Sequence, residues 1–180
     1  MKRSNIFLAC TMISTLFCSS VMATNQGGGA ITFRGAIVDA PCSIHPDDVN
    51  QILDMGRVAN SSLRDDRVPV KNFGIRLIGC DLKKYNPKGA SDLTGKWSGV
   101  RAKFTGTSIN NNKLLKISDN VGIELTQGGK ALTFGIASEK MELTGNQTLP
   151  FQAKLKTVSK AGDIALGEFT TVANFELSYE

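Results

Sequence analysis

The sequence has 180 residues, a formal net charge of +5, and 41% hydrophobic residues. A chain of this length forms one domain with room for a hydrophobic core. Its lysines and arginines are scattered, without the basic stripe or aromatic platform that nucleic-acid binding requires, so nucleic acid is not an expected partner.

Residues 1–23 have the three parts of a secretory signal peptide. Lys2 and Arg3 supply a positive start, an apolar run covers residues 6–21, and Val21-Met22-Ala23 is a small-residue cleavage signal. We therefore expect cleavage after Ala23. A membrane anchor is the alternative. No other apolar run reaches the roughly 18 residues that cross a bilayer, so the processed chain is not expected to span a membrane.

Four cysteines reduce to two when the signal peptide, which contains Cys10 and Cys18, is removed. In an exported protein the remaining pair, Cys42 and Cys80, is expected to form a disulfide. A metal site made by these two cysteines and His45 is the alternative, but it needs a fourth ligand and His45 is the only histidine. No nucleophile–base pair is evident either, so we expect no catalytic residues, no metal and no cofactor.

Apolar residues recur at every second position over residues 30–39, as in a β-strand. Ile31, Phe33, Gly35 and Ile37 share one face, and a period of two is typical of a strand with one buried face. The glycines at 27–29 indicate a flexible leader before it. Pro41 cannot donate to a β-ladder, so the strand pattern ends in a break.

The middle of the chain is a series of short strand patterns separated by turns. Strands are predicted over 51–56, 68–80, 99–106, 121–126, 131–134 and 149–158. Asn110-Asn111-Asn112 predicts a turn, and Gly128-Gly129 predicts a tight primed turn joining two of the strands. Residues 60–67 are read as a loop or one helical turn, and residues 81–98 as a long loop.

No segment of ten or more residues has helical periodicity, so the chain is predicted to be an all-β sandwich of immunoglobulin-like size. Trp97 follows both remaining cysteines instead of lying between them, so a true immunoglobulin domain is not expected.

The last thirteen residues also alternate, and their alternation runs to the end of the sequence. One face carries Phe169, Thr171, Ala173, Phe175, Leu177 and Tyr179. A strand at a terminus is unusual, because chain ends fray unless something ties them down. The first and last strands could pair within one molecule. That would give a complete secreted β-sandwich able to bind carbohydrate or another ligand, and alternation alone leaves this alternative open.

The chain resembles the subunits of chaperone–usher fimbriae (pili) of Gram-negative bacteria, of the type 1 and P-pilus kind. The resemblance is carried by residues 33–42, an alternating extension with Gly35 near its centre that runs into Cys42. It is carried also by the alternating C-terminus with Tyr179 penultimate, and by the spacing of Cys42 and Cys80. It covers the whole of the sequence after the signal peptide.

The resemblance implies an incomplete immunoglobulin-like β-sandwich that lacks its final strand. The sandwich would comprise residues 40–180, and residues 24–39 would form an N-terminal donor-strand extension. Ile31, Phe33, Gly35 and Ile37 would enter a groove in a neighbouring subunit, with Gly35 at a close approach of the two backbones. The groove would lie beside the C-terminal strand, on the face that carries Phe169 to Tyr179.

The resemblance also implies the partners and the location. A periplasmic chaperone would fill the groove first, and the extension of the next pilin subunit would replace it at an outer-membrane usher. The protein would thus be exported to the periplasm and then polymerise, as a homo- or hetero-polymer, into a cell-surface fimbria that supports adhesion. It would be a structural subunit and not an enzyme.

Overall fold

The computed structural model describes residues 28–86, 88 and 93–180. The expected signal peptide at 1–23 and the first part of the leader lie outside these described residues. The chain divides into two units, Met1–Ile37 and Val38–Glu180. The second unit carries the helices and strands.

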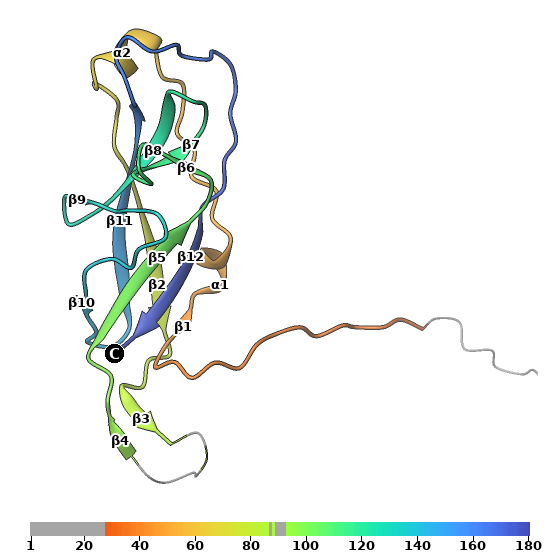
Figure 1. The fold of residues 1–180 in the computed structure, drawn as a ribbon. Coiled ribbons are helices and arrows are strands. Elements are labelled where there is room, and N and C mark those ends of the chain that lie inside the picture. Colours follow the sequence, from red (N-terminus) through yellow and green to blue (C-terminus); the bar gives the residue numbers. More distant parts are fainter. Residues whose placement is uncertain (1–27, 87, 89–92) are drawn as a thin grey trace, which may run out of the picture. The chain divides into compact units, whose positions relative to one another are not determined.

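The two larger antiparallel sheets of the Val38–Glu180 unit make up its sandwich (Figure 1). The larger sheet has the order β1 (Ser43–Ile44), β2 (Lys71–Ile78), β11 (Gln147–Thr157), β8 (Val121–Gln127), β7 (Leu114–Lys116) and β6 (Ser108–Ile109), and β9 (Lys130–Ala131) also pairs with β8. The smaller sheet has the order β10 (Met141–Glu142), β5 (Gly99–Thr105) and β12 (Asn174–Tyr179). The remaining elements are the hairpin of β3 (Lys83–Tyr85) and β4 (Leu93–Lys96), and the short helices α1 (Pro46–Val49) and α2 (Asn60–Arg64).

The strand order is that of an immunoglobulin fold with its last strand missing. An immunoglobulin domain pairs its strands as A-B-E-D in one sheet and C-F-G in the other. Here β1-β2-β11-β8 reproduces A-B-E-D, and β5-β12 reproduces C-F. Within the described residues, no strand occupies the G position beside β12. The predicted incomplete immunoglobulin-like sandwich is therefore confirmed.

Aromatic side chains join the two layers at the centre of the core. In Figure 1, β5 and β12 cross in front of β2 and β11. The ring of Phe104 on β5 meets Phe151 on β11 edge-on, with centroids 5.1 Å apart, and lies 6.3 Å from Phe73 on β2. Phe151 is 1% exposed, and burying a side chain of this size contributes roughly 1.5–3 kcal/mol. These contacts fix the position of β5, and with it that of β12.

The predicted turns are confirmed by backbone conformation. Asn110, Asn111 and Asn112 all have positive φ angles, between 52° and 62°. Gly128 and Gly129 have φ of 54° and 79°, as the primed turn of a two-residue hairpin requires. The strand after this turn is shorter than predicted, however. It ends at Ala131. The Leu132 amide still donates to the Leu125 carbonyl on β8, but the Phe134 amide donates to the Asn112 carbonyl instead.

The predicted strand over residues 51–56 is wrong. The structure shows no strand there. The Gly56 amide donates to the Asp54 carboxylate, and the side-chain amide of Gln51, not its backbone, reaches the Gly74 carbonyl. Side-chain hydrogen bonds of this kind, and not a backbone ladder, hold the segment in the described structure.

Two further boundaries differ from the prediction. Residues 81–98, expected to be a loop, contain the β3–β4 hairpin. The C-terminal strand begins at Asn174, six residues later than predicted, because its partner β5 ends at Thr105, directly opposite Asn174. Phe169 and Thr171 therefore precede the strand.

Candidate functional site

β12 pairs with a strand on one side only. Its register sets Phe175 opposite Phe104, Leu177 opposite Ala102 and Tyr179 opposite Val100, all on β5. We call the side of β12 that faces away from β5, over residues 174–179, the free edge. No strand in the described part of the chain pairs with it.

The free edge presents unpaired backbone groups. Glu180 and Gly99 exchange two hydrogen bonds of 3.0 Å. Because such pairs alternate along an antiparallel ladder, Asn174, Glu176 and Ser178 also bond toward β5. The amide and carbonyl groups of Phe175, Leu177 and Tyr179 then point the other way, and they have no hydrogen-bond partner among the described residues. An edge of this kind is a template for one more strand.

The side chains along the free edge cover the core incompletely. Phe175, Leu177 and Tyr179 are half-buried and pack against the core, as does Ala173 directly before the free edge. Their neighbours on β5 are fully buried; Val100, for example, is 0% exposed. An additional strand beside β12 would therefore remove apolar surface from water as well as satisfy its backbone.

Two aromatic contacts fix the half-buried rings. The ring centroids of Phe175 and Phe104 are 6.4 Å apart. The ring of Tyr179 meets that of the buried Trp97 edge-on, with centroids 6.3 Å apart. Burial raises the pKa of the Tyr179 hydroxyl above its usual value. Sequence reasoning placed Trp97 in a loop and missed this contact; a lone tryptophan directly before a predicted strand was the available signal.

The opposite face of β12 is charged and lies in solvent. Nζ of Lys103 on β5 is 2.6 Å from the carboxylate of Glu176, and Arg101 lies 3.3 Å from that of Glu180. Exposed pairs of this kind contribute little stability. They do show which residues of β12 face solvent: the even-numbered ones.

The expected donor residues lie in the Met1–Ile37 unit, where the described residues 28–37 form no helix or strand. Ile31, Phe33 and Ile37 are 80%, 87% and 105% exposed. A Cβ atom added at Gly35 would meet nothing within 4 Å, so no contact in the described part of the chain requires a glycine there. Three large apolar side chains within seven residues are therefore exposed to water.

Of the expected groove residues, Ala173 lies directly before the free edge, and Phe169 and Thr171 lie further from it. Phe169 is 39% exposed and precedes β12. The hydroxyl of Thr171 donates to the Lys116 carbonyl at 3.0 Å. These two residues thus lie on the segment that leads into the strand.

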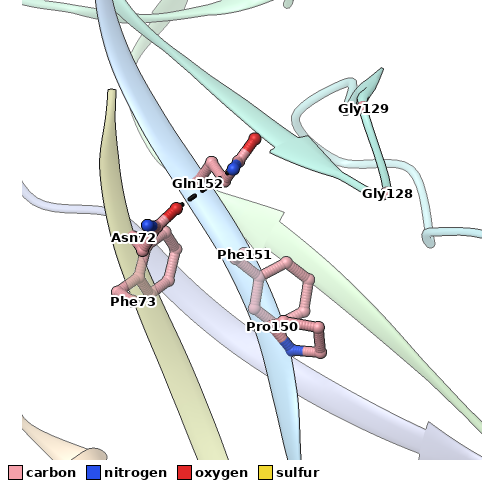
Figure 2. Close-up of a pocket in the computed structure, with 7 residues that line it drawn as sticks. All are labelled: Asn72, Phe73, Gly128, Gly129, Pro150, Phe151 and Gln152. Atoms are coloured by element: carbon pink, nitrogen blue, oxygen red, sulfur yellow. Dashed lines mark hydrogen bonds between the residues drawn. The ribbon is translucent and has the colours of Figure 1, made fainter. Parts of the chain in front are cut away.

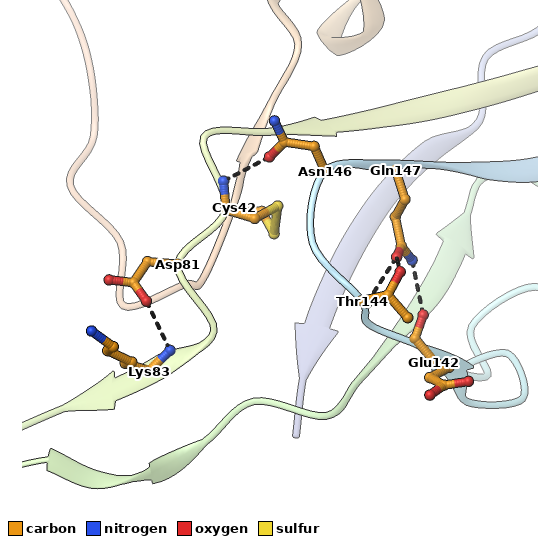
Figure 3. Close-up of a disulfide and its surroundings, with 8 residues drawn as sticks. Cys42, Asp81, Lys83, Glu142, Thr144, Asn146 and Gln147 are labelled. Atoms are coloured by element: carbon orange, nitrogen blue, oxygen red, sulfur yellow. Dashed lines mark hydrogen bonds between the residues drawn. A yellow bond between two sulfur atoms is a disulfide. The ribbon is translucent and has the colours of Figure 1, made fainter.

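The Cys42–Cys80 disulfide is confirmed. The bond joins Cys42, directly before β1, to Cys80, which lies two residues after the end of β2. Figure 3 shows its surroundings. The Asp81 amide donates to the Pro41 carbonyl at 2.8 Å, and the Cys80 amide donates to the side chain of Asn146 at 2.9 Å. Because the bond uses both sulfur atoms, the alternative metal site is excluded.

A shallow recess of about 260 Å³ lies beside β2, β11 and the β8–β9 turn (Figure 2). Gln152 and Asn72 share a hydrogen bond of 3.0 Å at its edge. Its other lining residues are Phe73, Gly128, Gly129, Pro150 and Phe151. None of these side chains ionises, so the recess offers no group for acid–base chemistry.

Comparison with known proteins identifies the family. The chain is 32% identical to the major MR/P fimbria protein of Proteus mirabilis (strain HI4320) over the full length of both. It also resembles the P pilus rod subunit PapA, with a TM-score of 0.65 and 27% identity over 78% of this chain and all of that one. A second solved structure, of a chaperone–usher pilus, is described as revealing the molecular basis of rod uncoiling. A chain of that structure matches with a TM-score of 0.69 and 29% identity, over 86% of this chain and 97% of that one.

No family model matches the sequence. The full-length relative nevertheless shows the family: this chain belongs to the pilins of chaperone–usher fimbriae. It is a structural subunit of a surface fimbria. In the described ranges, no helix is both long and apolar enough to cross a membrane.

Proposed function

We propose that residues 30–39 of one subunit act as a donor strand that pairs with the free edge of β12 in the next subunit. The donor strand would occupy the G position that the fold leaves open. Ile31, Phe33, Gly35 and Ile37 would face the core of the neighbour.

The observation that carries this proposal is the match between two incomplete features. The free edge has unpaired backbone groups above half-buried apolar side chains. Residues 30–38 have alternating apolar side chains that are exposed, and they contain no proline, so every residue can donate a backbone hydrogen bond. The donor strand would supply backbone partners and apolar side chains to the free edge, and the free edge would bury the exposed apolar side chains of the donor strand.

The same free edge is the proposed site for a periplasmic chaperone during export. An open edge over a partly wet core is prone to aggregation, so the subunit needs a temporary strand before its neighbour arrives. We further propose that residues 1–23 direct export to the periplasm, that residues 40–180 form the domain the chaperone caps, and that an outer-membrane usher hosts the exchange.

Deletion of Thr24 to Val38 tests the proposal. Co-expressed with the chaperone of its fimbrial system, the deleted chain should form a soluble complex and accept an extension from an intact subunit, but donate none. Normal head-to-tail polymers made from the deleted chain alone would refute donor-strand function. A misfolded domain would instead favour a complete sandwich that has lost an internal strand.

A further inference from the structure

We infer that an ion pair between Arg34 of the donor strand and Glu176 of the accepting subunit sets the register of assembly. The inference rests on the proposed function, and it adds which residue of one chain lies opposite which residue of the next. Neither the apolar alternation nor the open edge fixes this, because a strand can slip by two residues and still point the same side chains inward.

The direction of the donor strand follows from the fold. The G strand of an immunoglobulin sheet runs antiparallel to strand F, which is β12 here. Arg34 opposite Glu176 then sets Phe33 opposite Leu177 and Gly35 opposite Phe175. Inward-facing residues meet inward-facing residues, as the structure of the acceptor requires.

The charges of the two strands favour this register. Arg34 is the only charged residue between positions 30 and 38, and Glu176 is the only one between 174 and 179. Arg34 has no hydrogen bond or ion pair with any described residue. A slip of two residues in either direction would place Arg34 opposite Asn174 or Ser178, where no charge awaits it.

The geometry of the free edge brings these two side chains close. Phe175 and Leu177 turn their amides toward the incoming strand, so Glu176 falls in a non-hydrogen-bonded pair with Arg34. Side chains approach most closely in such pairs. Glu176 is 69% exposed, and Lys103 contacts it from the β5 side. Arg34 would approach from the other side and complete a row of three charges across three strands.

Side-chain size points to the same register. It places Gly35 opposite the large ring of Phe175 and Ile37 opposite the small Ala173. A slip by two in one direction would place Phe33 opposite Phe175 and leave Gly35 opposite Ala173. A slip in the other would place Ile37 opposite Phe175. Of these three registers, only the inferred one places Gly35 opposite an aromatic ring.

Cysteine cross-linking of assembled polymers tests the register with Arg34 and Glu176 left in place. Ala36→Cys combined with Asn174→Cys reports the inferred register, in a pair whose backbone separation suits a disulfide. Ala36→Cys with Val172→Cys, Val38→Cys with Asn174→Cys, and Ala36→Cys with Ser178→Cys report registers slipped by two or four residues. Mild oxidation, then denaturation without reductant, should give a covalent ladder for the first combination only.

The outcomes separate this inference from the proposed function. Polymers that form but cross-link through a slipped combination overturn the register and leave donor-strand exchange intact. A failure of all these chains and of the unsubstituted chain to polymerise overturns the proposed function itself.

Charge reversal at position 34 tests the cause of the register. Arg34→Glu should lower the yield of the inferred cross-link relative to the slipped ones. It should also slow polymerisation about two- to fivefold, the range that one cross-strand ion pair supports. Thr32→Glu, on the same outward face but opposite Ser178, is the matched control and should leave the cross-linking pattern unchanged. An unchanged pattern with Arg34→Glu would show that the ion pair does not set the register.

Discussion

The carboxylate of Asp48 on α1 accepts three hydrogen bonds from Arg76 on β2. One comes from the Arg76 backbone amide at 2.7 Å and two come from its guanidinium at 2.9 and 2.8 Å. Asp48 is 6% exposed, so this contact ties the short helix after β1 to a central strand of the larger sheet. Asp47 also approaches the guanidinium, at 3.4 Å.

This contact predicts an acid-sensitive component of stability. The hydrogen bonds from Arg76 lower the pKa of Asp48 from 3.8 to about 2. Since the folded-state pKa is the lower one, the stabilisation is complete above pH 3.8 and is lost as the pH falls toward 2. The free energy of unfolding, measured in urea between pH 2 and 6, should fall more steeply for the natural chain than for Asp48→Asn. Parallel curves for the two chains would contradict the prediction.

The half-buried state of Phe175 predicts a cost that depends on assembly. Phe151→Ala should destabilise the isolated subunit by roughly 3–5 kcal/mol, as expected for a fully buried ring. Phe175→Ala should cost less in the isolated subunit, because water already reaches its ring. When a peptide of residues 28–39 is added to chains that lack their own extension, the deficit of Phe175→Ala should grow while that of Phe151→Ala stays constant. Equal behaviour of the two variants would argue against a groove at β12.

Gly35 should matter only to the neighbouring subunit. Gly35→Val has no contact to disturb within 4 Å, so we expect less than about 0.5 kcal/mol of change in the stability of its own domain. A peptide of residues 28–39 with this change should no longer raise the melting temperature of an extension-deleted subunit. Ala36→Val, on the opposite face of the strand, is the matched control and should bind. Equal stabilisation by both peptides would rule out a close approach at Gly35.

Loss of the disulfide should be costly. The bond closes a loop with a sequence separation of 38 residues, for which chain entropy gives about 4 kcal/mol. Replacing Cys42 and Cys80 together by serine should therefore lower the free energy of unfolding by a few kcal/mol and reduce the periplasmic yield. Thiol labelling of the denatured, unreduced natural protein provides the control, since it should detect no free thiol.

The strands that could be predicted from the sequence are those whose apolar residues recur at every second position. In β2, Ile75 and Leu77 flank the polar Arg76 and are 0% and 1% exposed, so the two-residue spacing of these apolar residues matches their burial. The tight turn at Gly128 and Gly129 was also predictable, because glycine tolerates the positive φ angles it needs. A strand or turn can be predicted from the sequence where the pattern of its own residues matches their burial or backbone conformation.

The missed features depend on partners distant in the sequence. The start of β12 is set by the end of β5 at Thr105 and not by the alternation of apolar residues, which continues back to Phe169. The contact between Asp48 and Arg76 joins residues 28 positions apart, and neither residue stands out in its own segment. The β3–β4 hairpin lacks the alternating apolar residues by which a strand is normally found.

The disulfide at the root of the extension has a mechanical consequence. A pull on the extension arrives at Pro41 and Cys42, directly before the two-residue strand β1. The covalent bond to Cys80 and the hydrogen bond between Asp81 and Pro41 pass that tension straight to the end of β2. There it is spread along the seven residue pairs that join β2 to β11. In a stretched fibre the load therefore acts along the long ladder between β2 and β11. It does not have to be carried by the two residue pairs between β1 and β2.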